Sequence, residues 1–150
     1  MRLKTLQSYA DKIYLGDRVQ AFIKEYPKAK KVRPKVYISD TCGSDTAGQI
    51  WCDVSRRRME IELSRWILVD RKQTLSTIRH ELAHALTAIC ELGGAKHGKE
   101  FTKALKIVSP RTFRRDRHWY DNDSVFKARK KYHPKTRIYG NATSDLTNRL

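Results

Sequence analysis

The sequence predicts an α+β fold in which N-terminal helices and a small antiparallel sheet pack against one long central helix. Two observations carry this prediction. Apolar residues recur at helical spacing over 3–26 and 75–92, and three short runs between these segments alternate between apolar and polar residues. With 150 residues, of which 39% are hydrophobic and 32% charged, the chain has the size and composition of one globular domain.

The first predicted elements are one or two amphipathic helices. The residues that share one helical face are Leu3, Leu6, Ala10, Ile13 and Tyr14 before Gly16, and Val19, Phe22, Ile23 and Tyr26 after it. Pro27 ends the second run because proline cannot donate a backbone hydrogen bond. Residues 28–35, KAKKVRPK, form a basic connector.

Three short strands follow, over 36–39, 49–54 and 59–63, each rich in β-branched or aromatic residues. The turn-rich sequence DTCGSDTAG separates the first two strands. Ser55 and the run Arg56, Arg57 and Arg58 form a tight basic turn or a bulged edge between the second and third strands. These features predict a small antiparallel sheet.

The central helix is predicted to begin at Asp70, which forms a capping pair with Gln73, after a bridge over 64–69. Its apolar stripe consists of Leu75, Ile78, Leu82, Ala85, Ile89 and Leu92. The pair Gly93-Gly94 is expected to end it. A further helix is predicted around Phe101, Ala104, Leu105 and Val108, closed by Pro110.

Residues 80–84 of the central helix are His-Glu-Leu-Ala-His. Helical spacing places both imidazoles on one face, beside the apolar stripe, with a carboxylate between them. This HExxH pattern is typical of zinc hydrolases, which need three protein ligands, an open position for water and a general base. His80 and His84 are therefore candidate zinc ligands and Glu81 the candidate base, although the pattern also occurs by chance.

The third ligand is sought by elimination. A metzincin would have histidine where this chain has Cys90, which excludes that class. A thermolysin-type site would use glutamate, but Glu91 lies on the same helix as the motif and Glu100 on the next one. His97, at the start of the next helix, is the better candidate. His118 and His133 remain as weaker alternatives.

The basic residues point to a polyanionic partner. The chain has 32 Lys and Arg against 16 Asp and Glu, a net charge of +16, and the excess lies in 1–35 and 111–150 while 36–110 is nearly neutral. After residue 111, cations alternate with aromatic residues that could stack on unpaired bases. The alternative is that Trp119 and Phe126 cap the core. The candidate nucleic-acid contacts are Lys30, Lys31, Arg33, Arg56, Arg57, Arg58, Arg114, Arg115, Arg117, Lys130 and Lys131.

Three cysteines, Cys42, Cys52 and Cys90, form no CxxC pair, which argues against a zinc ribbon and a disulfide scaffold. We expect reduced thiols and an intracellular location, in the cytoplasm or with the nucleoid or nucleus. The first residues contain no apolar signal core, and no stretch is long enough to span a membrane.

The chain resembles the SprT-like metalloproteases, the family that includes the DNA-protein crosslink protease Spartan. The resemblance rests on HELAH at 80–84, HGKEF at 97–101 and IELSRWI at 61–67, and more loosely on Gly48, Ile50 and Trp51. It implies a zincin-like domain over 1–110 with a basic, aromatic-rich extension over 111–150. Relatives often carry a four-cysteine zinc ribbon at the C-terminus, and this chain has no cysteine after Cys90.

By this resemblance, His80, His84 and His97 would bind one catalytic Zn²⁺. Glu81 would be the general base, taking a proton from the attacking water and delivering it to the leaving amine. The implied function is a DNA-associated endopeptidase that cleaves DNA-bound or DNA-crosslinked proteins, with the strand over 59–63 docking the substrate. Two alternatives remain: a nucleic-acid-binding protein with a structural or vestigial zinc site, and a zinc peptidase whose charge serves solubility or another acidic partner.

Overall fold

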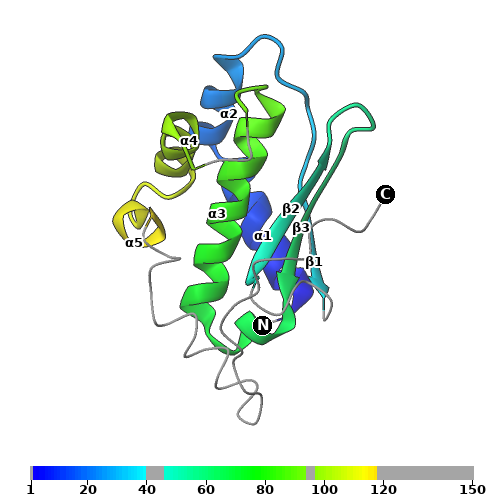
Figure 1. The fold of residues 1–150 in the computed structure, drawn as a ribbon, viewed down its shortest axis with the longest axis vertical. Helices are drawn as coiled ribbons and strands as arrows, with labels where there is room; N and C mark the ends of the chain where they lie inside the picture. The colour runs from blue at the N-terminus through cyan, green and yellow to red at the C-terminus, as the bar shows by residue number, and fades with distance from the viewer. Residues whose placement is uncertain (1, 40–45, 94–96, 118–150) are drawn as a thin grey trace, which may run out of the picture.

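The computed structural model describes residues 2–39, 46–93 and 97–117, and it has the α+β architecture that the sequence predicts (Figure 1). Within these ranges it contains α1 (Leu3–Tyr14), α2 (Asp17–Lys24), β1 (Lys35–Ser39), β2 (Gly48–Asp53), β3 (Arg58–Ser64), a 3-10 helix η1 (Arg65–Val69), α3 (Arg71–Ile89), α4 (Lys99–Val108) and α5 (Phe113–Arg117). Each predicted helix and strand is present, with its ends shifted by a few residues.

The sheet is mixed, so the prediction of an antiparallel sheet is wrong for one of its strands. Its order is β1-β3-β2: β2 and β3 form an antiparallel hairpin, whereas β1 pairs with β3 in parallel. The alternating pattern identifies residues that lie in a strand, but it does not specify which strand will be their neighbour. The third strand therefore enters the sheet between the first two.

The strand over 59–63 cannot dock a peptide by strand addition, because β3 is the central strand and both of its edges are paired. Helix α1 packs against β1 and binds backbone groups near the start of this strand. The Gln7 side chain of α1 accepts a hydrogen bond from Val36 N at 2.8 Å and donates one to Pro34 O at 3.2 Å. The other edge of the sheet belongs to β2.

The tight turn between β2 and β3 occupies the predicted basic segment. Arg57 adopts a positive φ of 53°, which a non-glycine residue rarely does outside a turn. At the other end of β2, Gly48 lies against α3. A Cβ atom at this position would lie 2.5 Å from Thr77 Cγ2, so only glycine allows β2 to approach the helix this closely.

Helix α3 is the centre of the fold and lies between the sheet and α4 (Figure 1). The sequence predicts one buried stripe, yet α3 is buried on nearly every side, with Thr74, Thr77, Arg79, His80 and Glu81 each at most 6% exposed. The fully buried apolar side chains on α3 and on the elements around it include Leu6, Phe22, Met59, Ile61, Leu63, Ile67, Ile78, Leu82, Leu86, Ile89 and Leu105. Polar residues on α3 therefore need a structural or chemical reason to be there.

The predicted start of α3 is confirmed, since the Asp70 carboxylate accepts a hydrogen bond from Gln73 N at 3.1 Å. Its predicted end at Gly93-Gly94 is wrong. The helix ends at Ile89, and Glu91, with φ 57°, takes the left-handed position that glycine usually occupies. Leu92 N donates to Thr87 O at 2.9 Å and Glu91 N to Ala88 O at 3.1 Å, which satisfies the last carbonyl groups.

Some predictions fall on residues outside the described ranges. These residues include Cys42, His118, Lys130, Lys131 and His133 as well as the aromatic residues after 118. Of the other two cysteines, Cys52 is exposed and Cys90 buried. In the part of the chain that the structure describes, no helix has the length and apolar character needed to cross a bilayer.

Candidate metal centre

Two adjacent helices supply three histidines to one point of the structure. His80 and His84 lie one turn apart on α3, and His97 directly precedes Gly98, the residue before the first turn of α4. Because α4 packs against α3, its beginning brings His97 to the face that carries the other two rings. The structure thus brings together the three histidines that the sequence analysis selected as candidate ligands.

The three Nε2 atoms form a compact triangle. They lie 3.2 Å apart for His80 and His84, 3.1 Å for His84 and His97, and 3.0 Å for His80 and His97. A tetrahedral zinc ion bound at about 2.0–2.1 Å would separate two such nitrogens by roughly 3.3 Å. The triangle therefore fits a metal ion with only small adjustments of the rings.

The triad lies on an apolar support. The buried Phe101 ring lies 4.9 Å from the His80 ring, 4.4 Å from His84 and 4.6 Å from His97, measured between centroids. His80 is 3% exposed, and burial, with smaller effects of His84 and His97, lowers its pKa to about 3. His80 is therefore neutral near pH 7, and neutral imidazole is the form that binds a metal.

Glu81 is 3% exposed, and burial raises its pKa to about 8. No hydrogen bond or ion pair to another described residue offsets this burial. An unpartnered buried carboxylate destabilises a fold, so it is a candidate functional group. Its place in the sequence, next to His80 and three residues before His84, directs attention to the metal centre.

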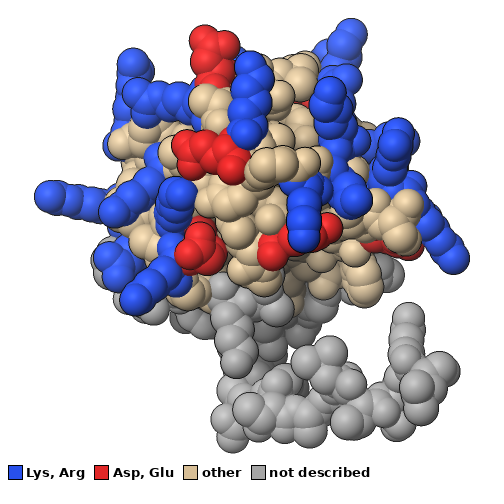
Figure 2. Space-filling view, turned by 90° about the horizontal axis from the view of Figure 1, so that it is seen from above, with Lys and Arg blue, Asp and Glu red and all other residues tan. Residues whose placement is uncertain are grey.

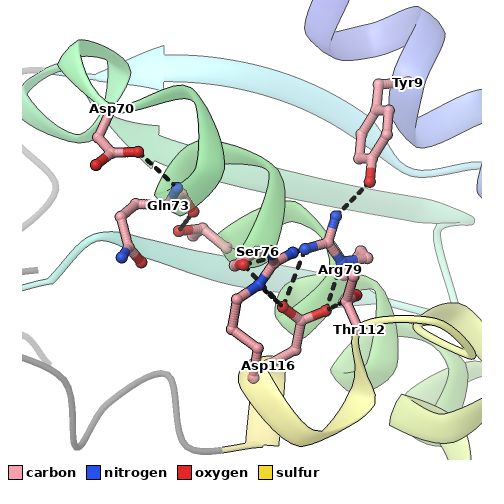
Figure 3. Close-up of polar contacts among 9 residues, drawn as sticks. Tyr9, Asp70, Gln73, Ser76, Arg79, Thr112 and Asp116 are labelled. Carbon is pink, nitrogen blue, oxygen red and sulfur yellow. Dashed lines mark hydrogen bonds and ion pairs between the residues drawn. The ribbon is translucent and has the colours of Figure 1, made fainter. Parts of the chain in front are cut away.

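A buried ion pair lies next to the triad on α3, and sequence reasoning missed it (Figure 3). Arg79 Nε donates to Asp116 Oδ2 at 2.5 Å, and Arg79 Nη2 donates to Asp116 Oδ1 at 2.9 Å. The two side chains are only 7% and 0% exposed. The one sequence signal for this ion pair was Asp116, a single acidic residue among Arg114, Arg115 and Arg117. Sequence alone does not identify Arg79, 37 positions away, as its partner.

The other candidate ligands lie elsewhere or are less suitable. Burial raises the pKa of Cys90 to about 11, so its thiol does not ionise near neutral pH. Glu91 and Glu100 are exposed. Among the described His, Cys, Asp and Glu residues, the group identified as able to hold a metal ion is His80, His84 and His97.

The predicted nucleic-acid contacts fall into separate places. Arg33, Arg56, Arg57 and Arg58 line one hollow, together with Lys35 and Tyr37. Arg114 and Arg115 line another hollow, at α5, while Arg117, Lys30 and Lys31 are exposed. These cations therefore form no single cluster within the described ranges.

Several of these cations also have acidic partners. Arg33 pairs with Asp11, Arg56 with Asp53, Arg58 with Glu60 and Arg115 with Asp116. Figure 2 shows the same mixture on one face, where Lys and Arg side chains project around the rim and Asp and Glu side chains lie between them. Nothing in these positions tests nucleic-acid binding, which stays a prediction.

Comparison with known proteins gives one match. The model of the SprT-like family matches residues 15–118. No curated protein and no solved structure shows significant similarity to this chain. The matched range contains the sheet, α3, α4, α5 and every residue of the candidate metal centre.

Proposed function

The chain belongs to the SprT-like family, and on this premise we propose that it is a zinc-dependent endopeptidase with a zincin-like arrangement that cleaves proteins bound or crosslinked to DNA. The observation that carries the proposal is the Nε2 triangle of His80, His84 and His97, with sides of 3.0–3.2 Å, together with the burial of Glu81, the residue that follows His80 in the chain. Family membership supports metallopeptidase chemistry, and the triangle supports a metal ion.

In this mechanism, His80, His84 and His97 would hold the zinc ion, which would supply Lewis-acid chemistry: polarisation of a peptide carbonyl and a lower pKa, about 7, for water. Glu81 accepts a proton from the attacking water at a carboxylate oxygen. As the new bond between oxygen and the carbonyl carbon forms and the C–N bond breaks, Glu81 passes this proton to the leaving amine. A nearby cation favours the ionised carboxylate that this role needs and so opposes the effect of burial.

The burial of Glu81 and the apolar support of the triad serve the same chemistry. The Phe101 ring contacts all three imidazole rings and so excludes water from that side of the triad. A raised pKa makes Glu81 a stronger base than an exposed carboxylate once it is ionised. The alternative of a purely structural zinc site does not account for the carboxylate, since such a site needs no buried glutamate between its ligands.

An extended substrate would add to the edge of β2, because β3 is internal and Gln7 of α1 already binds backbone groups near the start of β1. Strand β2 also packs against α3, the helix that carries the motif. Trp51 on β2 is 60% exposed, and its indole N–H donates to Glu62 Oε2 at 3.1 Å, which fixes the ring on the surface. This aromatic side chain is available to contact a substrate residue.

DNA is proposed as the partner because of the net charge of +16 and its concentration in the two flanks of the sequence. Ion pairs neutralise part of this charge on the described surface. The remaining described candidates are Lys30, Lys31, Arg57, Arg114 and Arg117, which form no ion pair within the described ranges. Phosphate contacts of this kind supply affinity without sequence preference.

The test is cleavage of a DNA-binding protein by zinc-loaded enzyme, with and without single-stranded DNA, beside the Glu81→Gln variant. We expect cleavage by the wild type, stimulation by DNA, and little cleavage by the variant. If zinc-loaded wild type leaves every protein substrate intact, the endopeptidase proposal fails. If cleavage is equally fast without DNA and no DNA binding is detected at low salt, the DNA partner is wrong while the peptidase stands.

A further inference from the structure

The buried carboxylate of Asp116 receives more hydrogen bonds than a surface ion pair would. It accepts two from Arg79, one from Ser76 Oγ at 2.7 Å and one from Thr112 Oγ1 at 2.6 Å. A fifth donor, Arg115 Nε, lies at 3.4 Å. Arg79 also donates to the Tyr9 hydroxyl of α1, on the side away from Asp116 (Figure 3). The network thus links α1, α3 and the chain around α5.

Both α3 residues of this network lie within one helical turn of His80. Ser76 precedes His80 by four residues and Arg79 precedes it by one, so Asp116 holds the turn of α3 from which the His80 side chain projects. Arg79 Nη2 also donates to Ser76 Oγ at 3.0 Å, which ties the two α3 side chains to each other. Any shift of this turn would break several buried hydrogen bonds at once.

Asp116 is also connected to α4, the helix that directly follows the third candidate ligand, His97. After α4, Ser109 N donates to Leu105 O at 2.9 Å, Thr112 N to Ser109 O at 3.1 Å and Asp116 N to Thr112 O at 2.9 Å. This short hydrogen-bonded chain connects the C-terminal end of α4 to Asp116, and Asp116 is bound to α3. His97 lies at the opposite end of α4, so the network sets how α4 lies along α3.

We propose that Asp116 is a positioning residue of the metal centre: through Arg79, Ser76 and Thr112 it locks α4 against the His80 turn of α3 and thereby sets the affinity of the triad for a metal ion. This inference rests on the metal site proposed above. Partners that orient metal ligands from outside the coordination sphere raise affinity because they remove the cost of arranging the ligands when the ion binds. Asp116 acts on the arrangement of two helices.

The test measures the zinc dissociation constant of metal-free protein by competition with a chromophoric chelator, for Asp116→Asn, Thr112→Val and Ser76→Ala. Folding of each variant is checked by circular dichroism at the temperature used. We expect Asp116→Asn to raise the constant by about 10- to 100-fold, and Thr112→Val and Ser76→Ala to raise it by smaller factors, because each removes one hydrogen bond to the carboxylate.

Two controls separate positioning from general stability. Asp11→Asn removes another arginine–carboxylate ion pair, which Asp11 of α1 forms with Arg33 of the basic connector. It should leave the zinc dissociation constant unchanged. Ile89→Val, a conservative change in the core, lowers stability without touching the network, and it should also leave the constant unchanged.

The inference is overturned if folded Asp116→Asn binds zinc as tightly as wild type, or if Ile89→Val weakens binding as much as a network variant of equal melting temperature does. If Asp116→Asn does not fold, the test uses Thr112→Val and Ser76→Ala instead. Zinc affinity equal to that of the wild type in both variants then overturns the inference. Wild-type protein that binds no zinc would instead overturn the proposed function and this inference with it.

Discussion

The Nε2 atoms of His80 and His97 lie 3.0 Å apart, although 17 positions separate the two residues in the chain. Helical spacing explains why His80 and His84 are neighbours, since both belong to α3. The approach of His97 depends on the packing of α4 against α3 and on the Phe101 ring below all three imidazoles. The candidate metal centre is therefore a product of helix packing as well as of the motif.

Removing His97 should abolish tight metal binding. In His97→Ala, two imidazoles of α3 remain. Loss of a residue that only orients a metal ligand lowers affinity by up to roughly 100-fold, and we expect the loss of a ligand itself to lower zinc affinity by more than this. Chelator competition and elemental analysis after dialysis measure the effect. Lys99→Ala, an exposed change two residues away, serves as the control. Stoichiometric zinc in His97→Ala would assign the third ligand elsewhere.

Glu81→Gln should separate binding from catalysis. The variant keeps the three imidazoles, so we expect it to retain zinc, while kcat for a protein substrate falls by about 10²- to 10⁴-fold because the proton acceptor is lost. Single-turnover cleavage and zinc content are measured on the same preparation. Unchanged kcat in the zinc-loaded variant would remove Glu81 from the mechanism.

Gly48→Ala should weaken the packing of β2 on α3. The new Cβ atom would lie 2.5 Å from Thr77 Cγ2 and 3.1 Å from Glu62 O, and we expect a loss of about 1–3 kcal/mol in the free energy of unfolding. Urea unfolding measures it. Gly98→Ala, where no atom lies within 4 Å of the added Cβ, is the control. In a double-mutant cycle, Thr77→Ala should recover part of the loss; purely additive effects would contradict the predicted clash.

Acid should destabilise the protein through Asp116. Burial would raise the pKa of this carboxyl, but hydrogen bonds from Arg79, Thr112 and Ser76 outweigh burial and lower the pKa from 3.8 to about 2. A carboxyl whose pKa is lower in the folded state stabilises the fold at pH values above its unfolded-state pKa, which is near 4. This stabilisation is lost as the pH falls through the folded-state pKa of about 2. The contribution is about 2 kcal/mol.

Urea unfolding of wild type and Asp116→Asn between pH 5 and pH 2 measures this contribution. The variant starts from lower stability at pH 5, because it breaks a buried pair, and should show a shallower decline toward pH 2. Parallel declines in the two proteins would mean that other carboxyl groups account for the acid sensitivity.

Arg57 should contribute more to DNA binding than its neighbours in the basic turn. Arg56 and Arg58 pair with Asp53 and Glu60, whereas Arg57 has no ion pair within the described part of the chain. We expect Arg57→Gln to lower single-stranded DNA affinity and to reduce the slope of log K against log salt by about 0.7. Arg58→Gln, whose arginine is already paired, should have the smaller effect. Equal slopes in wild type and Arg57→Gln would show that the turn does not contact phosphate.

Local sequence patterns were enough to predict most of the secondary structure and to select the candidate site residues. Apolar periodicity located the helices and strands, Asp70 with Gln73 located the start of α3, and HELAH with HGKEF gave three candidate ligands and a candidate base. These signals are local, because helical spacing, capping and turn formation involve residues within about four positions of each other. The end of α3 was misplaced because Glu91 adopts a conformation for which glycine is the usual residue.

The relationships between distant residues became apparent from the folded structure alone. It placed β3 between β1 and β2, buried Glu81 without a partner, and joined Asp116 to Arg79 across 37 positions. Apolar spacing along a chain states that a residue will be buried, but it does not state which distant residue will cover it. Which residue covers it depends on the combined packing of all the elements around α3. A buried charged residue such as Arg79 is tolerated there because the carboxylate of Asp116 binds it.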